Sequence, residues 1–132
     1  MKLRNKKITV MIVEDDNFLQ KMYSTKLEME GYGTILAEDG AKALRMAQKE
    51  KPDVILLDIL LPKMDGFEVL KGLKEDKKLK KIPVIMLTNL WQKEDVERGL
   101  ELGAEDFLIK AHFMPSEVIG KIKKYARVHR DS

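Results

Sequence analysis

Four apolar residues lead into a single acid in the stretch Val54-Ile55-Leu56-Leu57-Asp58-Ile59-Leu60-Leu61-Pro62-Lys63-Met64-Asp65-Gly66. A short apolar run bounded by turn residues is typical of a strand that is buried on both faces. Asp58 falls where this strand ends, and ligands bind at the C-terminal strand ends of open parallel α/β sheets. Asp is also a common turn former, so the residues that follow the other strands must decide whether this is a site.

Strand and helix patterns alternate along the rest of the chain. The expected strands are Ile8–Val13, Thr34–Ala37, Val54–Leu57, Pro83–Leu87 and Asp106–Ile109. The expected helices are Asn17–Glu30, Asp39–Glu50, Gly66–Glu75, Glu94–Leu102 and a last one that is capped by Ser116 and ends almost at the C-terminus. This alternation predicts a doubly wound, flavodoxin-like (βα)5 fold, an α/β arrangement whose parallel five-stranded sheet has the order 2-1-3-4-5. We expect one domain over residues 1–132, with no output domain.

The first helix has an apolar pattern that spreads over two adjoining faces. One face carries Phe18, Met22 and Met29, and the face beside it carries Leu19, Tyr23 and Leu27. Asp16 is the expected N-cap of this helix, and Gly31 is the expected stop.

Composition excludes several classes of protein. The chain has 132 residues, no Cys and two His, so neither a disulfide framework nor a thiolate or His-based metal site is expected. The apolar run after the basic N-terminus is too short for a signal peptide or a membrane span, and a cytoplasmic location with no membrane partner follows. The net charge is +3, and acids interrupt the lysine cluster between Lys71 and Lys81. We therefore favour a solvated helix end over a nucleic-acid patch, and expect no direct nucleic-acid binding.

Reactive groups follow four of the five strands. Glu14 and Asp15 come after the first strand, and Asp58, Thr88 and Lys110 come at the ends of the third, fourth and fifth. In the order 2-1-3-4-5 the first and third strands are neighbours, so Asp15 and Asp58 should face each other. Packed carboxylates repel and raise each other's pKa, and Mg²⁺, a hard cation with oxygen ligands, relieves this repulsion.

A structural explanation exists for each of these residues taken alone. Lys110 fits a surface lysine, Thr88 a strand-end hydroxyl and Asp15 a helix cap. Their joint position at one edge of the sheet instead indicates a site for a metal and a phosphoryl group. There the Lys would offer a point charge and the Thr a hydroxyl donor.

With these residues in place, the chain resembles the response regulator receiver domain of two-component signalling. The resemblance covers nearly the whole chain and rests on Val13-Glu14-Asp15-Asp16, Leu57-Asp58, Pro62-Lys63-Met64-Asp65-Gly66, Val84-Ile85-Met86-Leu87-Thr88 and Gly103-Ala104-Glu105-Asp106-Phe107-Leu108-Ile109-Lys110.

The resemblance implies a role for each site residue. It makes Asp58 the phosphoacceptor for a histidine kinase phosphohistidine. Asp15, Asp58 and the backbone carbonyl of Leu60 would bind Mg²⁺ or Mn²⁺, with Glu14 holding the metal through water. Thr88 and Lys110 would contact the phosphoryl group, and Phe107 matches the switch aromatic. The protein would then be a signalling phosphoacceptor rather than an enzyme with turnover.

The same resemblance implies the partners. The phosphodonor would be a sensor histidine kinase or a phosphotransfer domain. A downstream protein or output domain would read the fourth and fifth helices together with the fifth strand, and a phosphorylation-dependent homodimer is a further partner that the family allows.

Four positions set this chain apart from the common family pattern. Ala111 follows Lys110 where the family usually has a Pro in a cis peptide. Asn89 replaces a small residue, and it could either narrow access to Asp58 or donate to the phosphoryl group. The resemblance implies that Leu60 and Leu90 would flank the path of the hydrolytic water, which neither side chain can orient, and this predicts slow autodephosphorylation.

Two other functions share parts of the pattern. An Mg²⁺-dependent aspartyl-phosphate hydrolase would need an acid two residues after the nucleophile, where this chain has Leu60. A small flavodoxin-like domain that binds a flavin would need a phosphate-cradling loop after the first strand, where this chain has Glu14-Asp15-Asp16.

Overall fold

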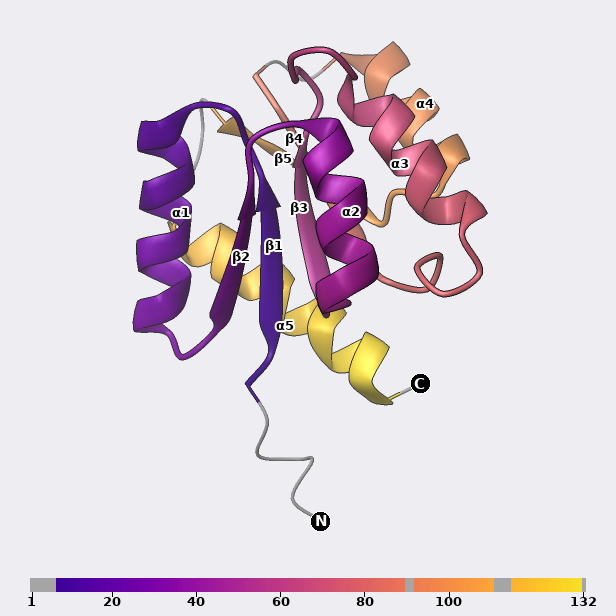
Figure 1. The fold of residues 1–132 in the computed structure, drawn as a ribbon. Helices are drawn as coiled ribbons and strands as arrows, with labels where there is room; N and C mark the ends of the chain where they lie inside the picture. The colour runs from indigo at the N-terminus through magenta and orange to yellow at the C-terminus, as the bar shows by residue number, and fades with distance from the viewer. Residues whose placement is uncertain (1–6, 90–91, 111–114, 132) are drawn as a thin grey trace.

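A five-stranded parallel sheet forms the centre of the molecule, with helices on both faces (Figure 1). The computed structural model describes residues 7–89, 92–110 and 115–131. The strands are β1 (Thr9–Val13), β2 (Gly33–Ala37), β3 (Val54–Asp58), β4 (Val84–Thr88) and β5 (Asp106–Ile109). Their order is β2-β1-β3-β4-β5, which confirms the predicted topology and places β2 at a sheet edge.

The helices are α1 (Asn17–Met29), α2 (Gly40–Glu50), α3 (Gly66–Glu75), α4 (Lys93–Leu102) and α5 (Pro115–Asp131). Each strand boundary, and each boundary of the first four helices, lies within one residue of its prediction. Ser116 was predicted as the cap of the last helix, and this is wrong. Pro115 is already helical, as expected for a residue that lacks an N–H and whose φ suits the first helical position.

Strand alternation divides the core into two layers. Met11, Val13, Leu57 and Met86 point toward the side covered by α2, α3 and α4, and their neighbours Val10, Ile12, Leu56 and Leu87 point toward α1 and α5. Both faces of the central strands are therefore buried, which explains why the sequence of β3 reads as an unbroken apolar run.

Helix α1 buries only one of its two apolar faces. Tyr23 and Leu27 are inside the core, whereas the side chains of Phe18 and Met29 are 75% and 74% exposed. Asp16 caps the helix as predicted, because its side chain accepts from the backbone N–H of Leu19.

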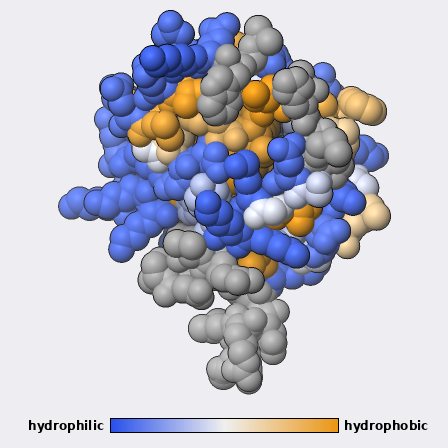
Figure 2. Space-filling model, turned by 180° about the vertical axis from the view of Figure 1, so that it is seen from behind, coloured by the Kyte–Doolittle hydropathy of each residue, from blue (hydrophilic) through white to orange (hydrophobic). Residues whose placement is uncertain are grey.

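The face of the molecule seen from behind is mostly hydrophilic (Figure 2). The hydrophobic residues visible on this face gather mainly in its upper half. Within the part of the chain that the structure describes, no helix combines the length and the apolar character needed to cross a bilayer.

Candidate functional site: an acidic cluster with a lysine

Three carboxylates meet where β1 and β3 end side by side. Oxygen atoms of Glu14, Asp15 and Asp58 lie within 4.8 Å of one another, as the strand order predicted. Glu14 and Asp58 are buried, and Asp15 is exposed. The cluster therefore opens to solvent on the Asp15 side.

Lys110 lies between the two buried acids. Its Nζ is 2.7 Å from Asp58 Oδ2 and 2.8 Å from Glu14 Oε1. Burial alone would lower the pKa of Lys110, but hydrogen bonds to the two carboxylates outweigh it and the pKa is raised. The ammonium group is consequently charged at neutral pH and balances part of the negative charge of the cluster.

Glu14 is held in place by the start of α1 and the end of β2. Its side chain accepts from the backbone N–H of Asp16 at 3.1 Å, and its own N–H donates to the carbonyl of Ala37. Burial raises the pKa of the Glu14 carboxyl, the neighbouring Asp58 raises it further, and Lys110 opposes both effects. A cation close to Glu14 would favour its charged form.

The loop after β3 fixes the second oxygen of Asp58. The backbone N–H of Leu60 donates to Asp58 Oδ1 at 3.1 Å. The loop turns back on itself, since the N–H of Gly66 donates to the carbonyl of Ile59 at 2.8 Å. A Cβ atom on Gly66 would lie 2.3 Å from the Asp58 carbonyl oxygen, so only glycine permits this approach. Asp65 then begins α3 through a reciprocal capping pair with Glu68.

The two predicted switch residues are buried on the other side of the cluster. Thr88 ends β4 and is 7% exposed, and Phe107 on β5 is 5% exposed. Thr88 also borders a pocket of about 310 Å³, which is lined by Ile59, Leu60, Thr88, Asn89, Gln92 and Asp95. The exposed Leu60 side chain and Asn89 therefore both line the pocket beside Thr88, and their effect on access to Asp58 stays a prediction. The predictions that involve Leu90 and the Lys110–Ala111 peptide lie outside the described residues.

Sequence reasoning missed several residues that shape the site. Gln20 donates its side-chain amide to the Glu14 carbonyl. Tyr23, which the sequence pattern placed only on an apolar face of the first helix, is buried in the core, and burial raises its pKa to about 12. The only sequence signal for Gln20 was its position one turn after the Asp16 cap. Gly66 had a turn signal, but its contact with the Asp58 backbone joins strand and loop and is invisible in a linear pattern.

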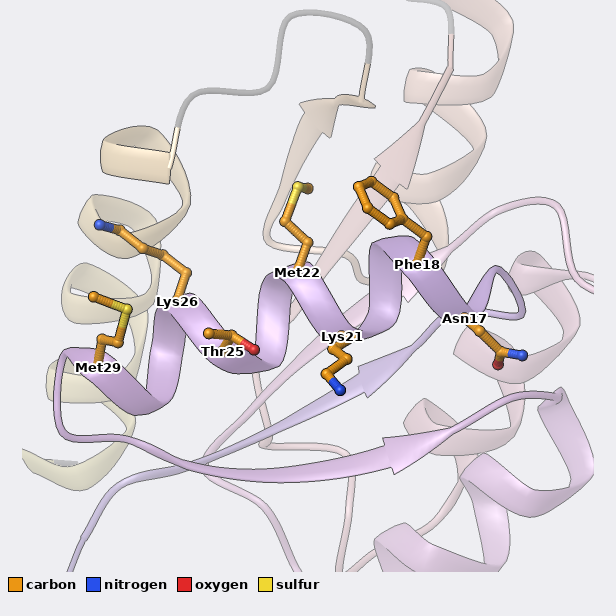
Figure 3. A pocket seen from close by; sticks show the side chains of 7 residues that line it. All are labelled: Asn17, Phe18, Lys21, Met22, Thr25, Lys26 and Met29. Carbon is orange, nitrogen blue, oxygen red and sulfur yellow. The ribbon is translucent and has the colours of Figure 1, made fainter.

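An apolar hollow lies along the exposed side of α1. It has a volume of about 600 Å³ and is lined by Asn17, Phe18, Lys21, Met22, Thr25, Lys26 and Met29. Phe18, Met22 and Met29 follow one another along the helix (Figure 3). Asn17 and Phe18, at the start of the hollow, directly follow the cap Asp16 in the sequence.

The donor set fits a hard divalent cation. All three acids offer oxygen ligands, and Mg²⁺ typically takes one or two carboxylates and completes its shell with water and phosphate oxygens. The exposed Asp15 leaves room for such additional ligands, whereas the Lys110 ammonium alone cannot balance three carboxylates.

Comparison with known proteins agrees with this geometry. Residues 10–123 match the model of the response regulator receiver domain. The chain is 43% identical over 123 residues to the alkaline phosphatase synthesis transcriptional regulatory protein PhoP of Bacillus subtilis, covering 93% of this chain and 49% of PhoP. The chain thus spans about half the length of this relative. The polar-differentiation response regulator DivK of Brucella anthropi is 42% identical over 117 residues, which cover 89% of this chain and 94% of DivK.

A solved structure also matches closely. The receiver domain of the sensor histidine kinase PA1611 from Pseudomonas aeruginosa superposes with a TM-score of 0.84 at 28% identity, covering 92% of this chain and 98% of that one. That structure holds a magnesium ion in its active-site cleft.

Proposed function

Because the chain belongs to the response regulator receiver domain family, we propose that it accepts a phosphoryl group on Asp58 from a phosphohistidine and thereby switches a partner-binding surface. The contact that supports this assignment best is the ion pair of 2.7 Å between Lys110 Nζ and Asp58 Oδ2. It places a charged donor beside Asp58, the last residue of the central strand β3, whose carboxylate also accepts from the backbone N–H of Leu60.

In the proposed reaction Asp58 is the nucleophile. One of its oxygens forms the new O–P bond while the N–P bond of the donor breaks, and the electron pair of that bond returns to the imidazole nitrogen. Lys110 is already charged and within hydrogen-bond reach of Asp58, so it can stabilise the phosphoryl oxygens without reorganising. The backbone N–H of Leu60 orients the carboxylate.

Mg²⁺ or Mn²⁺ would be held by Asp15, Asp58 and the carbonyl of Leu60, with Glu14 acting through water, and would supply further neutralisation of phosphoryl charge. Glu14 and Asp15 contribute no bond to the phosphoryl group themselves. Since Asp58 is both acceptor and product, the protein acts as a signalling module that catalyses only its own gain and loss of phosphate.

The phosphoryl group would act through Thr88 and Phe107. Its oxygens would draw the Thr88 hydroxyl toward Asp58, and the Phe107 ring would occupy the buried space left behind, which biases a pre-existing equilibrium between two states. Shifting that equilibrium from 1:99 to 99:1 needs about 5.5 kcal/mol. A few charge-assisted hydrogen bonds of about 1.5–3 kcal/mol each can supply this. The readout surface would be α4, β5 and α5.

A donor protein must bring its phosphohistidine to the edge where Asp58 lies. The apolar hollow on α1 starts at Asn17, directly after the Glu14-Asp15-Asp16 loop, and carries the exposed Phe18 and Met29 and the half-buried Met22. We assign this hollow to the apolar face of a helical kinase or phosphotransfer domain, because α1 follows directly on the loop that carries Glu14 and Asp15 and offers apolar anchors at helical spacing.

The two alternative functions have less support. Leu60 stands where a hydrolase needs an acid, and its apolar side chain is 65% exposed at the mouth of the pocket. The loop after β1 presents Glu14, Asp15 and Asp16, which would repel the phosphate of a flavin.

Intact-mass measurement with acetyl phosphate and Mg²⁺ tests the assignment. We expect a single phosphoryl adduct that is stable in acid, labile in base and absent when the metal is chelated. Asp58→Asn should form none, and Asp65→Asn, which alters the nearby α3 cap instead, should still form it. Equal labelling of Asp58→Asn and the parent would refute Asp58 as the acceptor.

A further inference from the structure

The ring of Phe107 ends against a glycine. Phe107 lies on the sheet face covered by α2, α3 and α4, where it pairs with Met86 of β4. Helix α4 crosses this face with Gly99, its only buried residue, toward the sheet. Phe107 is 5% exposed, so its ring fills the space between β5 and α4.

No side chain fits at position 99 while the ring is in this place. A Cβ atom on Gly99 would lie 2.4 Å from Phe107 Cζ, 3.1 Å from Cε1 and 3.4 Å from Cε2. The shortest of these separations is far inside the contact distance of two carbon atoms, about 3.5–4.0 Å. The tip of the Phe107 ring thus occupies the space that a side chain at position 99 would need.

Helix α4 is held against moving away from the ring. The Arg98 guanidinium stacks 4.4 Å from the centre of the Phe67 ring on α3. Val96 and Leu102, on the turns before and after Gly99, pack on the same core as Phe107. A glycine inside a helix is unfavourable compared with alanine, so its presence in this short helix calls for a packing reason, and the ring supplies one.

We infer that Gly99 is a positioning residue for the switch aromatic: it is the socket that admits the Phe107 ring to its buried position. This inference rests on the proposed function, with the added premise that phosphorylation favours the state in which the ring has the buried position seen in this structure. A methyl group at position 99 excludes the ring from that position. It should therefore disfavour the phosphorylated state and, by linkage, weaken the binding of any phosphoryl mimic at Asp58.

The test compares beryllofluoride binding in the presence of Mg²⁺, followed by ¹⁹F NMR, for the parent, Gly99→Ala and Gly120→Ala. Gly120 on α5 is the matched control, because a Cβ there would meet no atom within 4 Å. We expect the apparent affinity of Gly99→Ala to fall at least fivefold and that of Gly120→Ala to stay within twofold of the parent. In Gly99→Ala the ring resonances of Phe107 should also move to values typical of an exposed phenylalanine.

A double variant distinguishes exclusion of the Phe107 ring from a general destabilisation of the fold by the added methyl group. Phe107→Leu removes the tip of the ring, so Gly99→Ala combined with Phe107→Leu should fold at least as stably as Gly99→Ala alone and recover affinity relative to it. If Gly99→Ala does not fold, the double variant must fold, and failure of both overturns the inference.

The remaining outcomes are also decisive. Unchanged affinity and an unchanged Phe107 ring in Gly99→Ala overturn the socket while leaving the proposed function intact. If the parent and Gly120→Ala themselves fail to bind beryllofluoride at Asp58, the proposed function fails and the inference falls with it.

Discussion

At the scale of single residues, the site is organised around Lys110, which contacts two of the three clustered acids. Lys110 touches both Asp58 and Glu14, so its charge is shared between the proposed acceptor and a proposed metal-binding acid. Leu60 contributes in two ways: its N–H orients Asp58, while its apolar side chain stands exposed at the pocket beside Thr88. The Leu60 backbone thus orients the proposed acceptor Asp58, whereas its side chain has no polar atom that could orient a water molecule.

The lifetime of the phosphoryl group should be long for this reason. We expect Leu60→Asn and Leu90→Glu together to speed the loss of phosphate at least tenfold after donor removal, equivalent to about 1.4 kcal/mol of barrier. Polar groups that orient a water typically contribute about 10²–10⁴ in rate. Mass spectrometry over time, with both single variants as controls, measures the decay. Equal decay in all four proteins would show that the leucines only pack.

At the scale of elements, β5 and α5 are tied by a polar cluster on the proposed readout surface. Asp106 Oδ2 accepts from Lys121 Nζ at 2.7 Å and from the Tyr125 hydroxyl at 2.9 Å. Burial alone would raise the pKa of Asp106, but the hydrogen bond from Lys121 and others from the Phe107 backbone and Tyr125 outweigh it and the pKa is lowered. Burial and Asp106 together raise the pKa of Tyr125 to about 12. This tie sets the position of α5 beside the residue that precedes Phe107.

The tie should make stability depend on pH in a defined direction. A carboxyl whose pKa is lowered on folding stabilises fully above its unfolded value of about 3.8, and this contribution is lost as the pH falls through the lower folded value. Asp106→Asn should therefore cost about 1 kcal/mol of unfolding free energy at pH 7 and clearly less at pH 3. Urea unfolding at both values measures this. Tyr125→Phe, which removes a neutral donor, should show a weaker pH dependence, and a cost for Asp106→Asn that grows toward low pH would contradict the assignment.

Helix α1 should matter for donor proteins but not for small donors. Phe18→Ser removes a large exposed apolar anchor, and burying such a side chain is worth about 1.5–3 kcal/mol. We expect phosphotransfer from a cognate phosphohistidine protein to slow about tenfold or more at subsaturating donor, while labelling by acetyl phosphate is unchanged. Leu100→Ser on α4, which is also an exposed apolar residue, is the matched control. Equal rates for Phe18→Ser and Leu100→Ser would move the docking surface away from α1.

At the scale of the whole molecule, periodicity along the chain was sufficient for the architecture. Each central strand is buried on both faces, so β3 and β4 appear as unbroken apolar runs, and the turn residues between them set the alternation. The strand order then brought Glu14, Asp15 and Asp58 together as expected. The faces of α1 could not be ranked, because Phe18 and Tyr23 are equally plausible core residues until the positions of the neighbouring elements are known. The contact between Gly99 on α4 and Phe107 on β5 exists because Gly99 has no side chain. A sequence pattern does not show which distant residue will fill such a space.

Metal binding should stabilise the entire fold, because the acidic cluster joins β1 to β3 at the centre of the sheet. Mass action gives about 2.7 kcal/mol at a Mg²⁺ concentration one hundred times the dissociation constant. We expect thermal scans to show a rise in Tm of several degrees that is lost in Asp15→Ala and in Asp58→Ala. Asp16→Ala removes an acid outside the cluster and should keep the rise although the cap is lost. A rise that persists in both cluster variants would place the metal elsewhere.

The alternation of the strands has one more consequence, which concerns parity. Glu14 and Asp58 lie an even number of residues beyond Ile12 and Leu56, which point toward α1 and α5, whereas Thr88 lies an even number beyond Met86, which points toward α4. The pleat thus directs Glu14 and Asp58 to one face of the sheet and Thr88 to the other. One residue inserted into β4 would turn the Thr88 side chain to the opposite face of the sheet, away from Phe107. A second inserted residue would turn it back. The proposed signalling therefore depends on the odd or even position of each residue along its strand as well as on the chemistry of its side chain.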